Sequence, residues 1–371
     1  MSWYRIGALG LMAAALVAIA PKTLQAQELQ IGAILPLTGP AAPIGLDQQQ
    51  GVQFAVDNVN AAGGLHGHKV SVLYEDSQAK PDVGVLSFNK LVDLNNVPAV
   101  ISAFSSVSLA IAPLATRKKV LIFNAGAQSN QLANASPYLF NTIPLVKDET
   151  AVLVRYVVEK LGMKTAAIIY ENAAAGVDGK EDFKKAFEAL GGKILAEEPT
   201  EFGQTNYRPS LLKVASVKPD FMYLVMTQDL RPFVDQVSQI PGLPMGVGTT
   251  FMRTAFGYPA SVGWVQSAIK SDFAPDLEKE FKEKYKGTEV PFFSREYYNA
   301  ANVVMKAMDY LLEKNKPITG EALQAAIFEI KTFGTSVAQV TFDKSNTAVR
   351  GLEIYQYTKD ERKVVAVEAQ K

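Results

Sequence analysis

Short apolar, β-rich segments alternate with amphipathic helical segments along most of the chain. Apolar residues recur at helical spacing in the longer segments, and Gly or Pro interrupts the pattern between segments. Strands are predicted at 29–35, 69–74, 99–103, 120–124, 165–170 and 221–226, and helices at 46–60, 81–94, 149–161 and 297–312. This alternation is typical of parallel sheets covered by helices on both faces. The expected fold class is therefore α/β, and 371 residues are enough for two or three domains.

Residues 1–26 have the features of an export signal. Arg5 supplies a positive charge, the segment 6–20 is continuously apolar, and a small residue, Ala26, ends the region. The apolar run is shorter than the roughly 20 residues that span a bilayer, which argues against the alternative of an uncleaved membrane anchor. We therefore expect cleavage after Ala26 and a periplasmic product.

The composition excludes several kinds of chemistry. The chain has no Cys and two His residues, His66 and His68, and its 37 basic residues balance 37 acidic residues. The absence of Cys excludes thiol catalysis and Cys-ligated metal sites. The chain also lacks the excess of basic residues that would indicate binding to nucleic acid. Dinucleotide, P-loop, zinc-protease and nucleophile-elbow motifs are also absent from the sequence. We expect no catalytic residue, no metal and no cofactor, and we interpret the two histidines, which flank Gly67, as a solvated turn.

Polar loops follow four of the predicted strands, where open α/β sheets bind ligands. Three serines, Ser105, Ser106 and Ser108, follow the strand at 99–103 and precede a helix. Helix capping would use one serine, so the other hydroxyls predict an anion seat. The loops at 124–129, 172–176 and 226–228 follow further strands. Several neutral donors can share the charge of a carboxylate without Arg or Lys.

The segment 29–103 and four later motifs carry a resemblance to a known family. The first contains PLTGP and NAAGG, and the later ones are SSVSLAIAPLA, YENAAAG, PDFMYLV and YYNAANVV. Together they resemble the periplasmic solute-binding proteins of branched-chain amino-acid-type ABC transporters. The resemblance implies a monomeric clamp of two Rossmann-like lobes joined by a three-strand hinge, which closes on a small ligand and docks on a membrane permease.

The resemblance also implies a division of the chain. The strands between the lobes are expected near Pro144, Ser271 and Phe342. After the signal peptide at 1–26, the implied lobes are 27–144 plus 272–342 and 145–271 plus 343–371.

The family's ligand contacts carry over residue by residue. Ser106 matches the serine that holds the ligand carboxylate, and Gly126 and Ala127 match the turn whose backbone completes this seat. Gln128 matches a position that is usually Thr, so this side of the pocket keeps the family's character. The other side departs from the pattern: Ala175 and Thr227 replace Tyr residues, and Thr250 lies where an acid pairs with the ligand ammonium. The other residues expected in the site are Phe104, Ser105, Gln228 and Phe251.

Two ligand classes stay open, and of these we prefer the amine-free carboxylate. Without an acid in the pocket, a buried ammonium would lack a counter-charge, which favours an amine-free carboxylate such as an aromatic or 2-oxo acid. Ala175 would enlarge the cavity for a ring, and Phe104 and Phe251 could flank it. If Asp229 or Glu171 reaches the pocket, an aliphatic amino acid is expected instead. A ligand sensor on the same clamp and an α/β enzyme are the alternatives from other classes.

Overall fold

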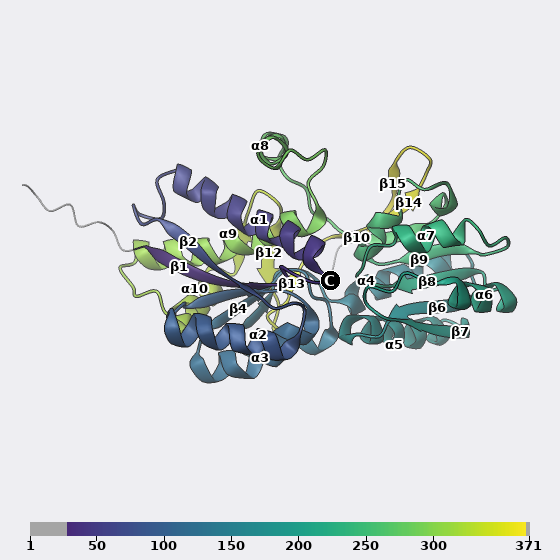
Figure 1. The fold of residues 1–371 in the computed structure, drawn as a ribbon, viewed down its shortest axis with the longest axis horizontal. Coiled ribbons are helices and arrows are strands. Elements are labelled where there is room, and N and C mark those ends of the chain that lie inside the picture. Colours follow the sequence, from purple (N-terminus) through teal and green to yellow (C-terminus); the bar gives the residue numbers. More distant parts are fainter. Residues whose placement is uncertain (1–27, 369–371) are drawn as a thin grey trace, which may run out of the picture.

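The computed structural model describes residues 28–368, which form two α/β lobes side by side (Figure 1). The first lobe contains a parallel sheet of five strands in the order β2-β1-β3-β4-β5. Its strands are β1 (Leu29–Leu35), β2 (Val70–Asp76), β3 (Ala99–Ser102), β4 (Leu121–Asn124) and β5 (Leu139–Asn141). Its helices are α1 (Ala42–Ala61), α2 (Pro81–Asn89), α3 (Ser105–Lys118), α8 (Pro275–Tyr285), α9 (Phe292–Glu313) and α10 (Gly320–Ile330).

The second lobe contains a sheet of seven strands in the order β15-β14-β10-β9-β8-β6-β7. The five strands from β10 to β7 are parallel, whereas β14 and β15 are antiparallel additions at one edge. The strands are β6 (Thr165–Glu171), β7 (Lys193–Thr200), β8 (Phe221–Val225), β9 (Met245–Gly248), β10 (Val265–Ile269), β14 (Leu352–Tyr357) and β15 (Arg362–Glu368). The helices are α4 (Val146–Arg155), α5 (Ala174–Ala189), α6 (Arg208–Val217) and α7 (Arg231–Val237).

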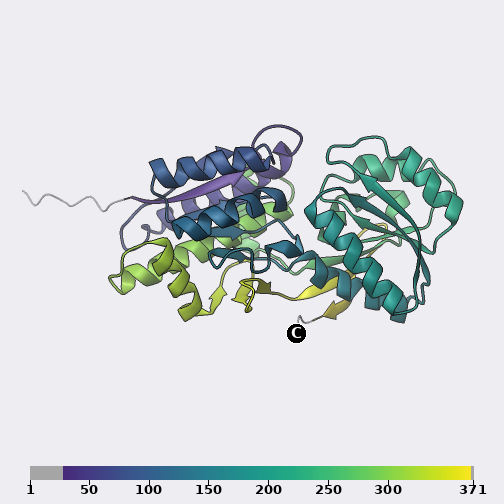
Figure 2. The same cartoon turned by 90° about the horizontal axis from the view of Figure 1, so that it is seen from below.

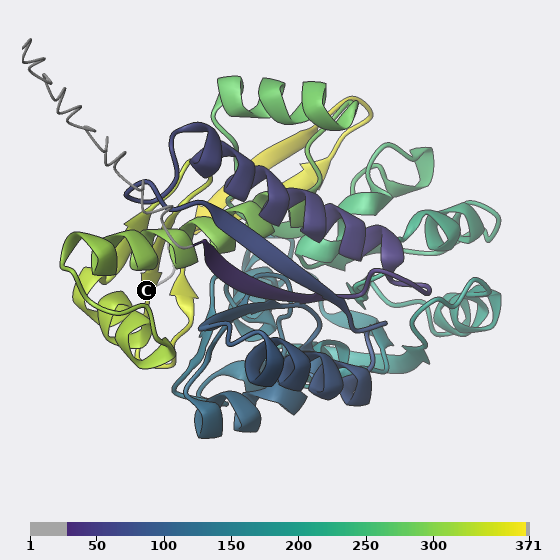
Figure 3. The ribbon, with the colours of Figure 1, turned by 60° about the vertical axis from the view of Figure 1, so that its left-hand side comes forward.

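Each sheet is buried on both faces, as near-continuous apolar strands require. In β1, Ile31 and Ala33 join the core beneath α1 and α9, while Ile34 joins the core beneath α2 and α3. Figure 3 shows these two helix pairs on opposite faces of the first sheet. In β6, Ile168 and Ile169 likewise enter two separate cores. The predicted α/β class is confirmed, and so is the arrangement in two lobes.

Three chain segments pass between the lobes, at 142–145, 270–274 and 350–351 (Figure 2). The first two passages contain Pro144 and Ser271. The third lies after the expected Phe342, because residues 343–349 stay with the first lobe. A small sheet of β11 (Thr332–Gly334), β12 (Gln339–Phe342) and β13 (Ala348–Val349) holds them, and Thr347 forms a bridge to Asn141.

Arg350 connects all three passages. Its guanidinium donates to the carbonyl oxygens of Thr142 (Nη1, 3.4 Å) and Lys270 (Nη2, 2.6 Å), which lie on the other two segments. It also forms an ion pair with Glu296 of α9, and the side chains of this pair are 1 % and 0 % exposed. The hinge is therefore built around one buried cation.

The boundaries differ from the sequence expectations mainly at helix ends. The first predicted helix begins earlier, at Ala42, where Pro43 occupies the first turn, the position in which proline is tolerated. The helices predicted at 81–94 and 149–161 each end in a wider π-type turn, at Lys90–Leu94 and Tyr156–Lys160. The expected signal peptide at 1–26 lies outside the described residues. Within 28–368, no helix combines the length and the apolarity needed to cross a membrane.

Candidate ligand-binding site

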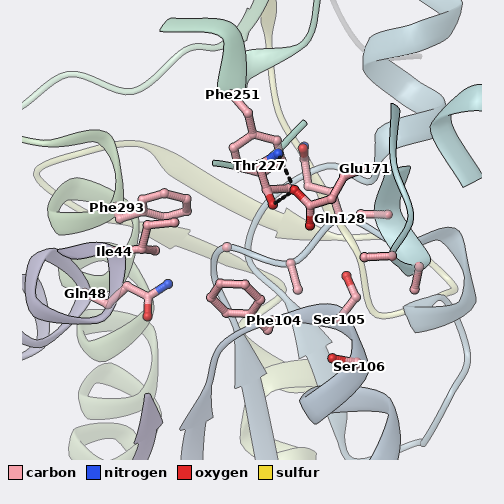
Figure 4. Close-up of a pocket in the computed structure, with 15 residues that line it drawn as sticks. Ile44, Gln48, Phe104, Ser105, Ser106, Gln128, Glu171, Thr227, Phe251 and Phe293 are labelled. Atoms are coloured by element: carbon pink, nitrogen blue, oxygen red, sulfur yellow. Dashed lines mark hydrogen bonds between the residues drawn. The ribbon is translucent and has the colours of Figure 1, made fainter. Parts of the chain in front are cut away.

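A cavity lies between the two lobes, where the carboxyl ends of both sheets meet (Figure 4). It encloses about 490 Å³ of empty space, including its open mouth. Residues from both lobes line it: Ile44, Gln48, Phe104, Ser105, Ser106, Gly126, Ala127, Gln128 and Phe293 from the first, and Glu171, Ala173, Ala174, Ala175, Thr227 and Phe251 from the second. Of the eleven residues that the sequence predicts for the site, nine line this cavity; the exceptions are Gln228 and Thr250.

The strand order explains the position of the cavity. Each parallel sheet has two neighbouring strands whose connections leave in opposite directions, β1 with β3 in the first lobe and β6 with β8 in the second. Loops diverge at such a switch point and leave a crevice between them. Ser105 follows β3, and Glu171 ends β6 while Thr227 follows β8. Both crevices therefore contribute polar groups to the same space.

The start of α3 supplies the polar groups with which the first lobe lines the cavity. Phe104 precedes the helix with φ of 63° and ψ of 135°, a backbone conformation that costs free energy in a non-glycine residue, and no side chain caps the helix. The first amides of α3 are left without intrahelical acceptors. Ser105 Oγ accepts a hydrogen bond from Ser129 N (3.2 Å), so its own proton is available to a ligand. Ser106 lies beside it in the cavity wall (Figure 4).

The turn after β4 is shaped by Asn124 rather than left open for a ligand. Asn124 Oδ1 accepts hydrogen bonds from Gly126 N (3.2 Å) and Ala127 N (2.8 Å), and its Nδ2 donates to Ala127 O (2.7 Å). These backbone amides, expected to hold the ligand carboxylate, are already engaged. The backbone amides and serine hydroxyls at the start of α3 are therefore more available to a ligand carboxylate than the amides of Gly126 and Ala127.

Gln128 connects the two lobes next to the cavity. Its Nε2 donates to Pro144 O (3.1 Å) and to Oε1 of Glu149 (2.7 Å), a fully buried residue of α4. Thr250 donates to the other oxygen of Glu149 through its backbone N (2.8 Å) and its Oγ1 (2.9 Å). Burial raises the pKa of Glu149, and the hydrogen bonds from Gln128, Ser267 and Thr250 partly offset this effect. Thr250 thus fixes a buried carboxyl group beside the hinge instead of lining the cavity.

Glu171 brings a carboxyl group into the cavity wall of the second lobe. It is 4 % exposed, and its Oε2 accepts hydrogen bonds from Thr227 N (3.0 Å) and Thr227 Oγ1 (2.7 Å), as drawn in Figure 4. Burial raises the pKa of Glu171, and the two bonds from Thr227 work in the opposite direction. Thr227 therefore orients the acid.

The other acid considered from the sequence, Asp229, lies outside the cavity lining. It forms an ion pair with Arg231 (Oδ2 to Nη2, 2.6 Å) near the surface. Gln228, next to it, accepts a hydrogen bond from Gly203 N (2.7 Å) through its Oε1 and so holds the loop after β7. Neither side chain adds to the cavity.

Small residues let α5 begin directly against β6. A Cβ atom on Gly176 would lie 2.0 Å from the carbonyl oxygen of Glu171, so glycine is required at this position. Ala173, Ala174 and Ala175 precede it and line the cavity with methyl groups only. The space beside Glu171 is therefore left free for a ligand.

Aromatic side chains form the apolar part of the cavity and touch across the cleft. The rings of Phe251 and Phe293 stack with centroids 5.9 Å apart, and Phe104 contacts Phe202 edge-on at 5.7 Å. Each pair joins one residue of the first lobe to one of the second. The lobes therefore contact each other through two pairs of aromatic rings.

Three lining residues of the cavity lie outside every loop that the sequence predicts for the site. Ile44 and Gln48 are on α1 and Phe293 is on α9, whereas Ala173 and Ala174, at the start of α5, belong to the predicted loop 172–176. Gln48 is 1 % exposed, and its Oε1 has no hydrogen-bond partner among the described residues. These helical positions carry no motif, because their role arises from how the helices pack over the strand ends.

No group of three or more His, Asp or Glu side chains within 28–368 is arranged to hold a metal ion. His66 lies 3.4 Å from Asp309, and both side chains are about half exposed, at 47 % and 52 %. The histidines therefore lie on the surface, apart from the cavity.

Comparison with known proteins identifies the family. The family model described as periplasmic binding protein matches residues 28–362. The leucine-, isoleucine-, valine-, threonine- and alanine-binding protein of Pseudomonas aeruginosa is 24 % identical over 362 residues, covering 94 % of this chain and 95 % of that protein.

Solved structures share the fold at low sequence identity. A solute-binding protein of an ABC transporter from Rhodopseudomonas palustris, in complex with 3,4-dihydroxybenzoic acid, is 20 % identical with a TM-score of 0.81, covering 92 % of this chain and 98 % of that chain. The branched-chain amino acid transporter substrate-binding protein LivJ from Streptococcus pneumoniae, in complex with isoleucine, is 21 % identical with a TM-score of 0.79, covering 92 % and 99 %. The chain described here belongs to the periplasmic binding protein family and has the two-lobed fold of the solute-binding proteins of ABC transporters.

Proposed function

We propose that this protein is the periplasmic solute-binding component of an ABC uptake transporter and that it binds an apolar α-amino acid between its lobes. The observation that carries the choice of ligand is the charge of the cavity. Among the described residues that line it, Glu171 is the single ionisable side chain, and it lies on the wall opposite the serines of α3. The sequence expectation of an amine-free carboxylate depended on a pocket without an acid, and this condition is not met.

A zwitterion matches both polar walls. The ligand carboxylate would accept hydrogen bonds from Ser105 Oγ, Ser106 Oγ and the first amides of α3, which lie at the positive end of a helix. The ligand ammonium would face Glu171 and supply the counter-charge that its buried carboxylate lacks. Gln48 Oε1 and Gln128 Oε1 are buried acceptors that have no hydrogen-bond partner among the described residues. Like Glu171, they would be satisfied by the N–H donors of a ligand ammonium. A lone carboxylate would instead add a second negative charge beside Glu171.

The apolar surface selects the ligand side chain. Phe104, Phe251, Phe293 and Ile44 offer rings and an aliphatic chain, and the alanines at the start of α5 leave room among them. A mostly apolar cavity with a few polar groups of this kind is typical of small-molecule sites. A branched aliphatic or aromatic side chain would fill it, and each buried CH₂ group would contribute about 0.8 kcal/mol.

An amine-free aromatic acid is the second candidate, and the raised pKa of Glu171 favours it. A protonated Glu171 would not repel a ligand carboxylate, and it could donate a hydrogen bond to a ring hydroxyl. Related structures are described in complex with 3,4-dihydroxybenzoic acid, benzoate and isoleucine, so both ligand classes occur on this fold.

Calorimetric titration of the ligand-free protein tests the choice. We expect leucine or phenylalanine to bind tightly, and we expect benzoate and 4-hydroxybenzoate, which lack an ammonium, to bind far more weakly. The reverse order would overturn the amino-acid assignment and leave the aromatic acid. If none of these ligands bound, both the apolar amino acid and the simple aromatic acid would be ruled out. Catalytic turnover of a bound ligand would contradict a transport function.

Replacement of Ser106 tests the carboxylate seat. The side chain of Ser106 forms no hydrogen bond with other described residues, whereas Ser105 accepts one from Ser129. Ser106→Ala should therefore leave the melting temperature of the ligand-free protein nearly unchanged and weaken ligand binding by about 1–3 kcal/mol, the cost of an unmet buried charge. Ser216→Ala, an exposed position on α6, is the control. Unchanged affinity in Ser106→Ala would place the carboxylate elsewhere.

A further inference from the structure

A second cavity lies at the hinge, next to the ligand site but separate from it. It encloses about 390 Å³ of empty space, including its open mouth. Its lining comes from both lobes and from the second passage between them: Thr250, Arg253, Gln266, Ala268, Ile269, Ser271, Asp272, Phe292, Arg295, Tyr355 and Arg362. Neither the proposed transport function nor the ligand seat described above uses these residues.

Three arginines converge on this cavity. Arg295 is on α9 of the first lobe, Arg253 is in the 3₁₀ turn Thr250–Ala255 of the second lobe, and Arg362 begins β15. Asp272 is the single acid among the described lining residues, so positive charge is in excess. Burial, together with the nearby charges of Arg295 and Arg362, lowers the pKa of Arg253 to about 10. Burial also lowers the pKa of Arg295.

Existing contacts leave this charge largely unsatisfied. Arg253 Nη2 lies 3.6 Å from Oε2 of Glu289, whose side chain is 75 % exposed and therefore screened by solvent. The guanidinium of Arg362 lies over the ring of Tyr355, 5.0 Å from its centroid, and its Nη1 is 3.5 Å from Gln266 Oε1. These contacts are too long or too exposed to neutralise Arg253 and Arg362. Arg295 is attracted by the carboxylates of Asp272 and Glu296, but Glu296 is already paired with Arg350.

Two buried donors of the cavity have no acceptor. Ser271 is 6 % exposed, and neither its Oγ nor Arg295 Nε has a hydrogen-bond partner among the residues that the structure describes. Such a buried polar group destabilises the protein as long as it stays unpaired. Unpaired donors together with an excess of arginine indicate an acceptor-rich anion, because guanidinium groups pair with oxyanions through several parallel hydrogen bonds.

We propose that this cavity binds a small dianionic oxyanion of the phosphate or sulfate type, held by Arg295 of one lobe and by Arg253 and Arg362 of the other. A dianion matches the excess of positive charge in the lining. Its oxygens can accept hydrogen bonds from the guanidinium groups and from Ser271.

The anion would also couple to ligand binding. Phe251 lies between Thr250 and Arg253 in the chain, and Phe293 lies between Phe292 and Arg295; these two rings stack across the ligand cavity. An anion that joins Arg253 to Arg295 would hold together the segments that carry this contact. It would therefore favour the closed arrangement and tighten ligand binding, and the ligand would tighten anion binding by the same factor.

Direct titration of the ligand-free protein with sodium sulfate and with sodium phosphate tests the site, with sodium chloride at matched ionic strength as reference. We expect saturable binding of both dianions and a higher melting temperature than in chloride. Arg295→Gln and Arg362→Gln should each weaken sulfate binding about ten-fold or more, the effect of losing a charge-assisted hydrogen bond. Arg208→Gln, which removes the same charge from an exposed position on α6, should bind sulfate normally.

Sulfate that behaves like chloride, or that binds equally to Arg208→Gln and both cavity variants, would overturn the proposal. Arg362 is at an edge strand, so its variant decides the question if Arg295→Gln fails to fold. The direct titration contains no amino acid, so its result does not depend on the proposed transport function. In a second titration, sulfate should tighten leucine binding several-fold in the unmodified protein and should have no effect in Arg362→Gln; equal affinities with sulfate and chloride would refute the coupling.

Discussion

Glu171→Gln should weaken amino-acid binding by about 2–5 kcal/mol, or roughly thirty-fold and more, because it removes the counter-charge of a buried ammonium. The amide keeps the size of the side chain, and it can still accept a hydrogen bond from Thr227 through its oxygen. Titration calorimetry with leucine or phenylalanine measures the change. Glu201→Gln is the matched control. Glu201 is an exposed acid that directly follows β7, the strand next to β6, and it lies outside the cavity lining.

The same variant distinguishes the two ligand classes. An amine-free carboxylate would bind Glu171→Gln as tightly as the unmodified protein or more tightly, because a like charge is removed. An unchanged affinity for amino acids would contradict the proposed role of Glu171.

The pH dependence provides a second readout of Glu171. Its pKa is raised above 4.5 in the ligand-free protein, so acidification protonates it and removes the partner of the ammonium. Amino-acid affinity should therefore fall as the pH decreases through this pKa, and Glu171→Gln should lose that part of the dependence. An aromatic acid would show the opposite trend, binding more tightly as Glu171 becomes neutral.

Arg350→Met should destabilise the ligand-free protein by about 3–5 kcal/mol, because it leaves Glu296 as an uncompensated buried charge at the hinge. The carbonyl oxygens of Thr142 and Lys270 would lose their donor at the same time. Chemical denaturation measures the loss. Lys270→Met is the control: it removes a positive charge from the same region, but its side chain is 62 % exposed, and exposed pairs contribute about 0–1 kcal/mol.

A double variant separates the ion pair from general packing. Adding Glu296→Gln to Arg350→Met removes the stranded carboxylate, so the double variant should be more stable than the sum of the single losses predicts. A simple sum would mean that Arg350 acts through packing and through the two carbonyl groups. A loss below about 1 kcal/mol in Arg350→Met would contradict its role at the hinge.

Local pattern was sufficient to predict much of the fold. Apolar runs bounded by Gly and Pro located strands such as β1, β3 and β6, because parallel strands buried on both faces need continuous apolar sequence. Less regular elements were not located. The strand β7 contains Glu197 and Glu198 and lies at a sheet edge, and β5 has three residues, so neither carries a clear signal.

The sequence predicted which strand ends carry the site residues, but it did not predict which of these residues face one another. Ser105 and Ser106 follow β3, and the carboxyl ends of strands are where such sheets bind ligands. Glu171 and Asp229 both follow strands of the second lobe, and the sequence could not choose between them. Glu171 ends β6 at the switch point beside β8, where Thr227 turns it into the cavity, whereas Asp229 pairs with Arg231. Strand order, which periodicity does not encode, makes the difference.

The sequence by itself determined the α/β class, the family and the polar strand ends, because these depend on residues close together in the chain. The tertiary structure decided which groups face one another: Glu171 opposite Ser106, Arg350 at the three passages between lobes, and Arg253 near Arg295. These partners come from different lobes or from distant strands. The physical reason is that charge compensation depends on distance in space, and the packing of the two sheets sets that distance.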